Sequence, residues 1–282
     1  MQRAPVRRTE SQLTASDGLS LYRRAWLPAA PERALAVVHG WAEHSGRYDE
    51  LGSWLAERGC AVHAYDQRGH GRSGGSRGHV RRFDELPDEL GRVLEEVRRA
   101  QPGLPLFVLG HSLGGLVVAS FLVERGPALT GAILSGAALA VPEGMSRPRL
   151  AAARWLRRLA PRLPMASGVD PQGLSRDPEV VRRYLEDPLV HRRMTVSLAS
   201  ETLRVMSSTA AGARRVGVPT LVLHGAEDPI CAPQGSREFA SGLRVEGSGL
   251  EVLPGLRHEI LNEPEREQIY RTMLDWMRRR EA

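Results

Sequence analysis

Short apolar segments alternate along the chain with longer segments in which apolar residues recur every three or four positions. The first pattern is typical of strands buried on both faces of a parallel sheet, and the second of helices that cover such a sheet. The apolar segments predict strands at residues 34–38, 60–65, 106–109, 131–134, 220–223 and 250–253. The periodic segments predict helices at residues 48–58, 86–100, 116–124, 234–241 and 265–280. The expected fold class is α/β, with a mostly parallel central sheet and helices on both faces.

Two regions depart from this alternation. Residues 7–15 and 20–27 are strand-like and flank Asp17-Gly18, a pair that favours a tight hairpin turn. Residues 140–215 contain many Pro and Arg residues and no clear strand, which indicates an inserted helical cap. The expected division is a core of residues 1–139 and 216–282 and a cap of residues 140–215.

One segment of the predicted cap has the pattern of an amphipathic helix with a basic side. Its apolar side carries Ala152, Trp155, Leu156, Leu159 and Leu163. Its other side carries Arg154, Arg157, Arg158 and Arg162. The apolar side either rests on the core below or docks onto an anionic lipid surface. A cap that moves would allow both arrangements.

The composition is that of a folded globular protein, with 41% hydrophobic and 26% charged residues. No stretch reaches the ~18 to 20 uninterrupted apolar residues of a bilayer span, and the basic first residues lead into no apolar signal segment. Cys60 and Cys231 have no partner at the spacing of a disulfide framework or a zinc site. We therefore expect a cytoplasmic protein that binds no metal.

The charge balance raises nucleic acid as a partner, since the net charge is +6. All 39 basic residues are Arg, and 33 acidic residues are scattered among them. Only five Tyr and four Phe are available to stack on bases. We expect no nucleic-acid partner, and the sequence leaves the oligomeric state open.

Candidate chemistry begins at Ser112, within the G-x-S-x-G pattern of residues 110–114. The pattern follows a predicted strand and precedes a predicted helix, the setting in which a nucleophilic serine is held on a sharp turn. A second match around Ser73 lies between polar turns, so we interpret Ser73 as a loop serine. Ser112 is the predicted nucleophile.

A serine nucleophile needs a histidine base and a carboxylate that orients it, in the chain order Ser, acid, His. Of the nine histidines, only His258 follows both the serine and a suitable acid, on the loop after the last strand. Glu227 and Asp228 are adjacent candidates for the acid after residues 220–223. We predict Asp228, because its rigid Pro229 neighbour suits a fixed orientation.

Acyl transfer also needs two donors for the oxyanion that forms in the transition state. The backbone N–H of Leu113, directly after the nucleophile, is the first predicted donor. The backbone N–H of Trp41, on the loop after residues 34–38, is the second.

These motifs together resemble those of α/β-hydrolases of the monoacylglycerol lipase and lysophospholipase group, over nearly all of the chain. The matching segments are His39 to Tyr48, Asp66 to Ser73, Gly110 to Gly115, Leu223 to Asp228, Pro254 to Glu259, and, in the cap, Ser175 to Val180 and Asp187 to Val190. The resemblance implies the α/β-hydrolase fold and hydrolysis of a glycerol ester with one fatty acyl chain. It also implies a lipid-facing cap and no metal or organic cofactor.

Some implications of the resemblance concern the substrate pocket. Glu43 matches a glutamate that lies near the glycerol head group in some relatives, and the alternative is an ordinary loop carboxylate. Ala42 stands where the group often has Gly, and the bulky Trp41 stands where a small residue is common. Cys231 follows the predicted acid closely, either beside the site or as a small buried residue.

A triad on this fold does not determine the substrate. The predicted activity is cleavage of monoacylglycerol to glycerol and fatty acid. A lysophospholipase, a broad carboxylesterase and a serine peptidase remain alternatives, as does a non-catalytic binding protein. A peptidase would need a carboxylate to hold the substrate's amino terminus.

Overall fold

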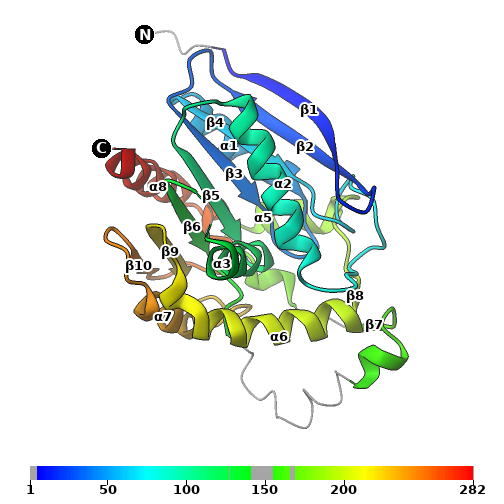
Figure 1. Cartoon of the computed structure of the whole chain (residues 1–282). Coiled ribbons are helices and arrows are strands. Elements are labelled where there is room, and N and C mark those ends of the chain that lie inside the picture. Colours follow the sequence, from blue (N-terminus) through cyan, green and yellow to red (C-terminus); the bar gives the residue numbers. More distant parts are fainter. Residues whose placement is uncertain (1–4, 127, 141–154, 166–168, 282) are drawn as a thin grey trace.

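The computed structural model describes residues 5–126, 128–140, 155–165 and 169–281. Within these residues, eight strands form one sheet through the centre of the molecule (Figure 1). Strand β2 pairs antiparallel with β1 and β4, and every other neighbouring pair in this sheet is parallel. The strand order is β1 (Arg7–Thr14), β2 (Ser20–Leu27), β4 (Cys60–Tyr65), β3 (Arg33–Val38), β5 (Leu106–His111), β6 (Gly131–Ser135), β9 (Thr220–Gly225) and β10 (Gly249–Leu253). The predicted mostly parallel sheet is confirmed.

The predicted hairpin is also confirmed. Thr14 of β1 pairs with Ser20 of β2, and the Ala15 N–H donates to the carbonyl of Leu19 at 2.8 Å. Gly18 has a φ of 82°, in the left-handed region that glycine tolerates without strain.

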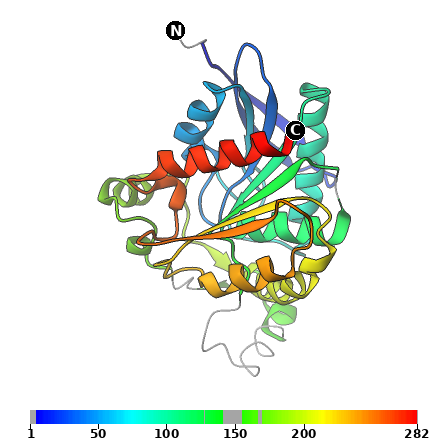
Figure 2. The ribbon, with the colours of Figure 1, turned by 90° about the vertical axis from the view of Figure 1, so that its left-hand side faces the viewer.

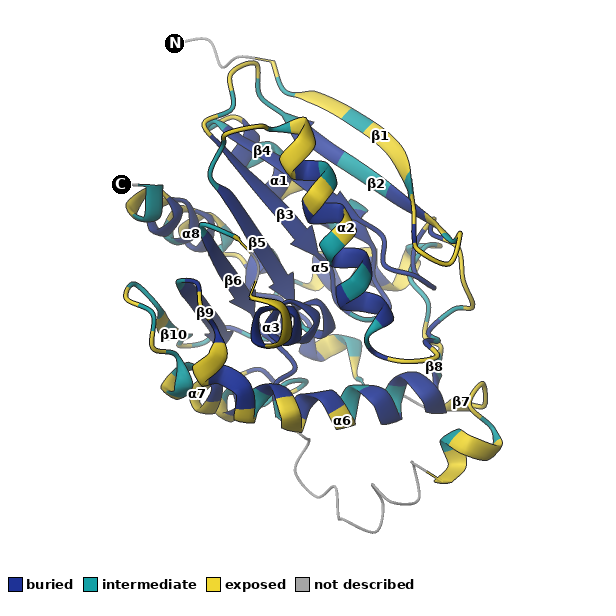
Figure 3. Cartoon of the chain, in the orientation of Figure 1, coloured by how far each residue is buried: buried dark blue, intermediate teal, exposed yellow. Residues whose placement is uncertain are grey.

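Helices cover both faces of the sheet (Figures 1 and 2). The helices α2 (Glu85–Ala100), α3 (Leu113–Arg125), α6 (Val196–Gly212) and α7 (Pro233–Gly242) pack into one apolar cluster with the strands. A second cluster on the opposite face contains α1 (Asp49–Ala56) and α8 (Arg266–Glu281). Every residue of β3, β4, β5, β6 and β9 is buried (Figure 3). Burial on both faces explains why these strands have nearly continuous apolar sequences.

The chain between β6 and β9 adds α5 (Pro178–Glu186), α6 and the short 3₁₀-helices η2 (Pro171–Gly173) and η3 (Ala213–Arg215). It also contains an antiparallel ribbon of β7 (Pro164–Met165) and β8 (Met194–Thr195). The expectation of no strand here was wrong, because two-residue strands are too short to produce a periodic pattern. Helix α6 packs on α3 and contributes to the core cluster. The division into a core and a cap at residues 140–215 stays a prediction.

The amphipathic segment of this insertion exposes its apolar side. Residues 155–159 are helical, and Trp155 and Leu159 are 65% and 81% exposed. The helix next to β7 is accordingly coloured as exposed in Figure 3. Leu156, Leu163 and Met165 are exposed as well. Ala152 and Arg154 of the predicted helix lie outside the described residues.

An ionic contact holds Arg157 of this segment against the core. The Arg157 guanidinium donates to the carbonyl of Arg81 at 2.7 Å and lies 3.1 Å from the carboxylate of Glu201 on α6. Glu201 is buried and also accepts a hydrogen bond from the Phe83 N–H. Arg157 on the basic side therefore faces the core, whereas Arg158 and Arg162 of the same side are exposed. The alternative in which the apolar side rests on the core was wrong for residues 155–159.

We predict that Gly114→Ala destabilises the fold by about 1–3 kcal/mol, the usual cost of overpacking a close-packed core. A Cβ at Gly114 would lie 2.2 Å from the carbonyl oxygen of Val38 and 2.4 Å from that of His39. Both obstacles are backbone atoms, so α3 would have to move away from β3. Urea unfolding of Gly217→Ala is the matched control, because a Cβ at the exposed Gly217 meets nothing within 4 Å. Equal stability of the two variants would contradict the prediction.

Candidate active site

Ser112 lies on the turn between β5 and α3, as predicted. Its φ of 54° and ψ of −118° are strained for a residue with a side chain. Backbone hydrogen bonds hold this geometry. The Ser112 N–H donates to the carbonyl of Ser135 at 3.0 Å, and the Ser112 carbonyl accepts the N–H groups of Leu116 and Ala138 at 3.1 Å each. The N-terminus of α3 begins directly after the serine. Its partial positive charge favours negative charge that develops at the hydroxyl.

His258 and Asp228 are hydrogen-bonded to each other. The distance from His258 Nδ1 to Asp228 Oδ2 is 2.7 Å, and both residues are buried. The second carboxylate oxygen accepts the N–H groups of Ile230 at 2.8 Å and Cys231 at 2.9 Å, which holds the carboxylate in place. Glu227 is exposed. Of the two adjacent candidates, Asp228 therefore has the geometry of the acid.

His224 is a partner of Asp228 that the sequence analysis did not identify. Its Nε2 lies 3.0 Å from Asp228 Oδ2, and its Nδ1 lies 2.7 Å from the Ser236 hydroxyl. Burial opposes ionisation of Asp228, but hydrogen bonds from His224 and His258 outweigh it and hold the pKa of this carboxyl below its ordinary value. The only signal in the sequence was that His224 and Asp228 are four residues apart, at the end of one strand and in the loop after it. A single sequence does not show that this loop folds back and brings the two side chains together.

The loop after β3 passes close to Ser112. A Cβ on Gly40 would lie 3.1 Å from Ser112 Cβ. Ala42 has a φ of 69°, so a position that often carries Gly in the resembled group is in a left-handed conformation here. The Trp41 indole donates to the carbonyl of Arg193 at 3.3 Å, which ties this loop to the insertion. The role of the Trp41 and Leu113 N–H groups as oxyanion donors stays a prediction.

Ser112 and His258 line a common pocket of about 290 Å³. Its polar end also includes His111, Glu43 and Glu259. Most of the remaining wall is apolar and includes Met165, Leu174, Met194, Leu203, Met206 and Ile230. The structure thus brings together a nucleophile, a buried base–acid pair and an apolar cavity. The described residues contain no group of three or more His, Cys, Asp or Glu side chains that could hold a metal ion.

Two further side chains border the nucleophile. The ring centroid of His111 lies 4.9 Å from that of His258. Burial, and then the proximity of His258, lowers the pKa of His111 to about 4, so it is neutral at pH 7. Cys231 lines the pocket beside Ser112, and burial raises the pKa of its thiol. The sequence placed Cys231 either beside the site or in the interior, and it lies beside the site.

The comparison with known proteins identifies the family. The family model described as "Serine aminopeptidase, S33" matches residues 29–265. The chain belongs to this family. Among the relatives of this chain, the monoacylglycerol lipase of Mycolicibacterium smegmatis is 34% identical over 96% of this chain and 97% of its own. The monoglyceride lipase of Homo sapiens is 32% identical over 96% of this chain and 90% of its own.

A solved structure supports the fold. The crystal structure of the Paleococcus ferrophilus monoacylglycerol lipase matches with a TM-score of 0.84 and 36% identity, over 92% of this chain and 99% of that one. The predicted α/β-hydrolase fold and the predicted family are both confirmed. In the part of this S33 chain that the structure describes, no helix combines the length and the apolar character needed to cross a bilayer.

We predict that Asp228→Asn lowers kcat on a p-nitrophenyl ester by about 1,000-fold or more, the scale of loss when a triad acid is neutralised. The amide would no longer hold His258 in the tautomer that presents a free Nε2. Glu227→Gln, the matched control at the exposed neighbour, should keep wild-type kcat. The opposite pattern, with Glu227→Gln inactive and Asp228→Asn active, would show that the acid was assigned wrongly.

Proposed function

We propose that this protein is a serine hydrolase that cleaves carboxylic esters of a single fatty acyl chain, monoacylglycerols foremost, through an acyl-enzyme on Ser112. The observation that carries the proposal is the buried His258–Asp228 pair at the same pocket as the strained Ser112. The names of the relatives, monoacylglycerol lipase and monoglyceride lipase, support the choice of substrate.

The proposed reaction has two steps. Because His258 Nδ1 donates to Asp228, the lone pair of Nε2 is available to take the Ser112 proton as the hydroxyl attacks the ester carbonyl. The N–H groups of Trp41 and Leu113 stabilise the oxyanion, and the protonated His258 gives its proton to the departing alcohol. Water then attacks the acyl-enzyme with the same histidine as base. Fatty acid is released and Ser112 is regenerated.

The walls of the pocket favour an acyl ester over a peptide with a free amino terminus. The apolar side chains around Ser112 suit a hydrocarbon chain. Two carboxylates at the polar end, Glu43 and Glu259, resemble what an aminopeptidase needs. Both already accept hydrogen bonds from Arg47, at 3.0 Å and 2.6 Å, so each is engaged within the chain, although one guanidinium balances only one of the two negative charges. In this proposal Glu43 forms the wall beside the glycerol.

We expect Ser112→Ala to lose at least about 1,000-fold in kcat on monoacylglycerols, with the fold intact, because no other group supplies the nucleophile. The wild type should turn over monoacylglycerols faster than lysophospholipids and short p-nitrophenyl esters, and leave aminoacyl amides intact. Wild-type turnover by the purified variant would refute the role of Ser112.

The same panel tests the alternatives. Preference for lysophospholipids, for short esters or for amides would select the corresponding enzyme instead. A fluorophosphonate probe should label the wild type and not Ser112→Ala. Absence of labelling in the wild type would support a non-catalytic binding protein.

We further propose that residues 140–215 act as a cap that contacts a lipid surface. Met165, Met194 and Leu203 of this segment line the pocket, so the cap covers the site where the acyl chain would lie. The exposed Trp155 and Leu159 extend from the same segment, beside arginines that favour anionic head groups. A cytoplasmic protein with peripheral membrane contact is the resulting proposal for localisation.

We predict that the double variant Trp155→Ser/Leu159→Ser binds vesicles of mixed neutral and anionic phospholipid at least about tenfold more weakly than the wild type, since each buried apolar side chain contributes about 1.5–3 kcal/mol. Co-sedimentation measures the binding. Leu185→Ser on α5 is the matched control, because Leu185 is also exposed but lies on a different helix. Unchanged binding of the double variant would exclude this surface.

A further inference from the structure

One guanidinium joins the two loops that carry the candidate oxyanion donor and the candidate base. Arg47, on the 3₁₀-helix η1 (Ser45–Tyr48), donates to Glu259 Oε1 at 2.6 Å and to Glu259 Oε2 at 2.8 Å. It also donates to Glu43 Oε2 at 3.0 Å. Arg47 and Glu259 lie 212 positions apart in the chain. The contact is therefore tertiary and no local sequence pattern encodes it.

On one side, the network reaches the oxyanion loop. Glu43 Oε1 accepts the Gly40 N–H at 2.6 Å and the Tyr48 hydroxyl at 2.9 Å. Gly40 directly precedes Trp41, so the Glu43 carboxylate orients the chain that presents the Trp41 N–H. The left-handed Ala42 lies between them and makes this loop dependent on such contacts.

On the other side, the network reaches the histidine loop. Glu259 directly follows His258, and its N–H donates to the carbonyl of Leu174 at 2.8 Å. The Asn262 side chain donates to Glu259 Oε2 at 2.9 Å. Glu259 is buried, so its position restricts where the His258 ring can stand.

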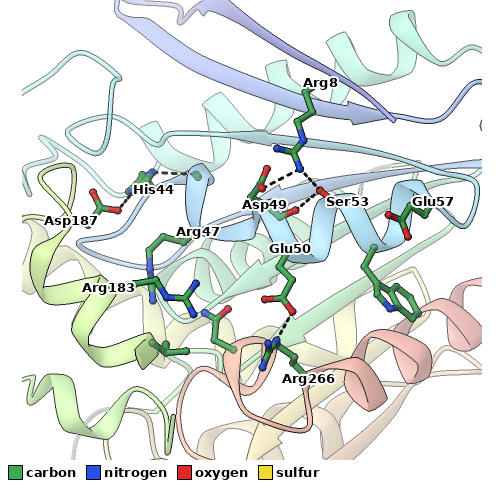
Figure 4. A pocket seen from close by; sticks show the side chains of 14 residues that line it. Arg8, His44, Arg47, Asp49, Glu50, Ser53, Glu57, Arg183, Asp187 and Arg266 are labelled. Carbon is green, nitrogen blue, oxygen red and sulfur yellow. Dashed lines mark hydrogen bonds and ion pairs between the residues drawn. The ribbon is translucent and has the colours of Figure 1, made fainter. Parts of the chain in front are cut away.

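We propose that Arg47 is a positioning residue, which sets the oxyanion loop and the histidine loop at one fixed separation by binding Glu43 and Glu259 together. The proposal rests on the function proposed above. Arg47 acts through the two carboxylates, which line the catalytic pocket, whereas Arg47 itself lines a separate cleft of about 590 Å³ on the outer side. Figure 4 shows this outer cleft with Arg47 on its wall, near His44 and Arg183.

Burial makes this ionic contact strong. The side chains of Arg47, Glu43 and Glu259 are only 10%, 4% and 3% exposed. Burial opposes ionisation of both glutamates, yet the Arg47 charge holds the pKa of each carboxyl below its ordinary value. The Tyr184 ring of α5 covers the guanidinium at 5.0 Å. Removal of Arg47 would leave two buried carboxylates without a counter-charge, so the loops would move apart or take up protons.

The first test measures kcat and KM for Arg47→Gln on a p-nitrophenyl ester, with active sites counted by fluorophosphonate labelling. We expect kcat per labelled site to fall about 10- to 100-fold with little change in KM, because donor and base are displaced only by a fraction of an ångström to an ångström. Arg47→Lys keeps the charge and should recover part of the loss. Unchanged kcat, a change confined to KM, or no recovery with Lys would overturn the proposal.

Arg33→Gln is the matched control for a purely structural arginine. Arg33 is 3% exposed and lies 2.5 Å from Glu281 and 2.8 Å from Glu32, away from the pocket. Its loss should lower the unfolding temperature and leave kcat per labelled site unchanged. An equal fall in kcat for Arg33→Gln and Arg47→Gln would show that the loss in Arg47→Gln comes from lower stability of the fold. It would refute the proposed positioning role of Arg47.

A double-mutant cycle covers the case in which Arg47→Gln does not fold. Glu43→Gln and Glu259→Gln each leave one Arg47 ion pair in place. If both act through Arg47, the double variant should lose much less than the product of the two single losses in kcat. Independent, multiplying losses would overturn the proposal. The same cycle can be measured by the rate of fluorophosphonate labelling, which needs no lipid substrate. If the wild type is labelled but does not cleave monoacylglycerols, the proposed function fails while the role of Arg47 can still be tested.

Discussion

The close crossing of α3 over β5 and β3 is the constraint on which the site depends. Gly114 approaches the carbonyls of Val38 and His39 more closely than any side chain would allow. The turn between strand and helix is therefore tight, and Ser112 is held in a conformation that an unconstrained chain would leave. The parallel strands β3, β9 and β10 have their carboxyl ends at the same edge of the sheet, and the loops that follow them begin there. Trp41, Asp228 and His258 consequently meet beside the serine.

Buried charge is the second determinant of the site. Asp228 is paired with two imidazoles, and Glu43 and Glu259 share one guanidinium. Such groups are stable in the interior only with partners in place, so each pair ties together segments that are distant in sequence. These partners restrain the side chains at the polar end of the pocket. Its apolar end is lined by flexible methionines, which adapt to the shape of a hydrocarbon chain.

The orientation of residues 155–165 follows from the same principle. The buried carboxylate of Glu201 pairs with Arg204 on α6 and also with Arg157, which reaches it from the basic side of the segment. The apolar side is then directed outward, which is unfavourable in water and favourable against a lipid surface. The Arg157–Glu201 ion pair and the proposed lipid contact thus lie on opposite sides of the same short helix.

The sequence alone determined the alternation of strands and helices, the hairpin at Gly18, the turn at Ser112 and the order of the candidate triad. These depend on residues close together in the chain, where periodicity, glycines and strand ends are visible. Only the tertiary structure decided that His224 supports Asp228, that Arg47 joins Glu43 to Glu259, and that residues 155–159 turn their apolar side outward. Each of these contacts depends on which distant segments share one small volume, and no local pattern contains that information.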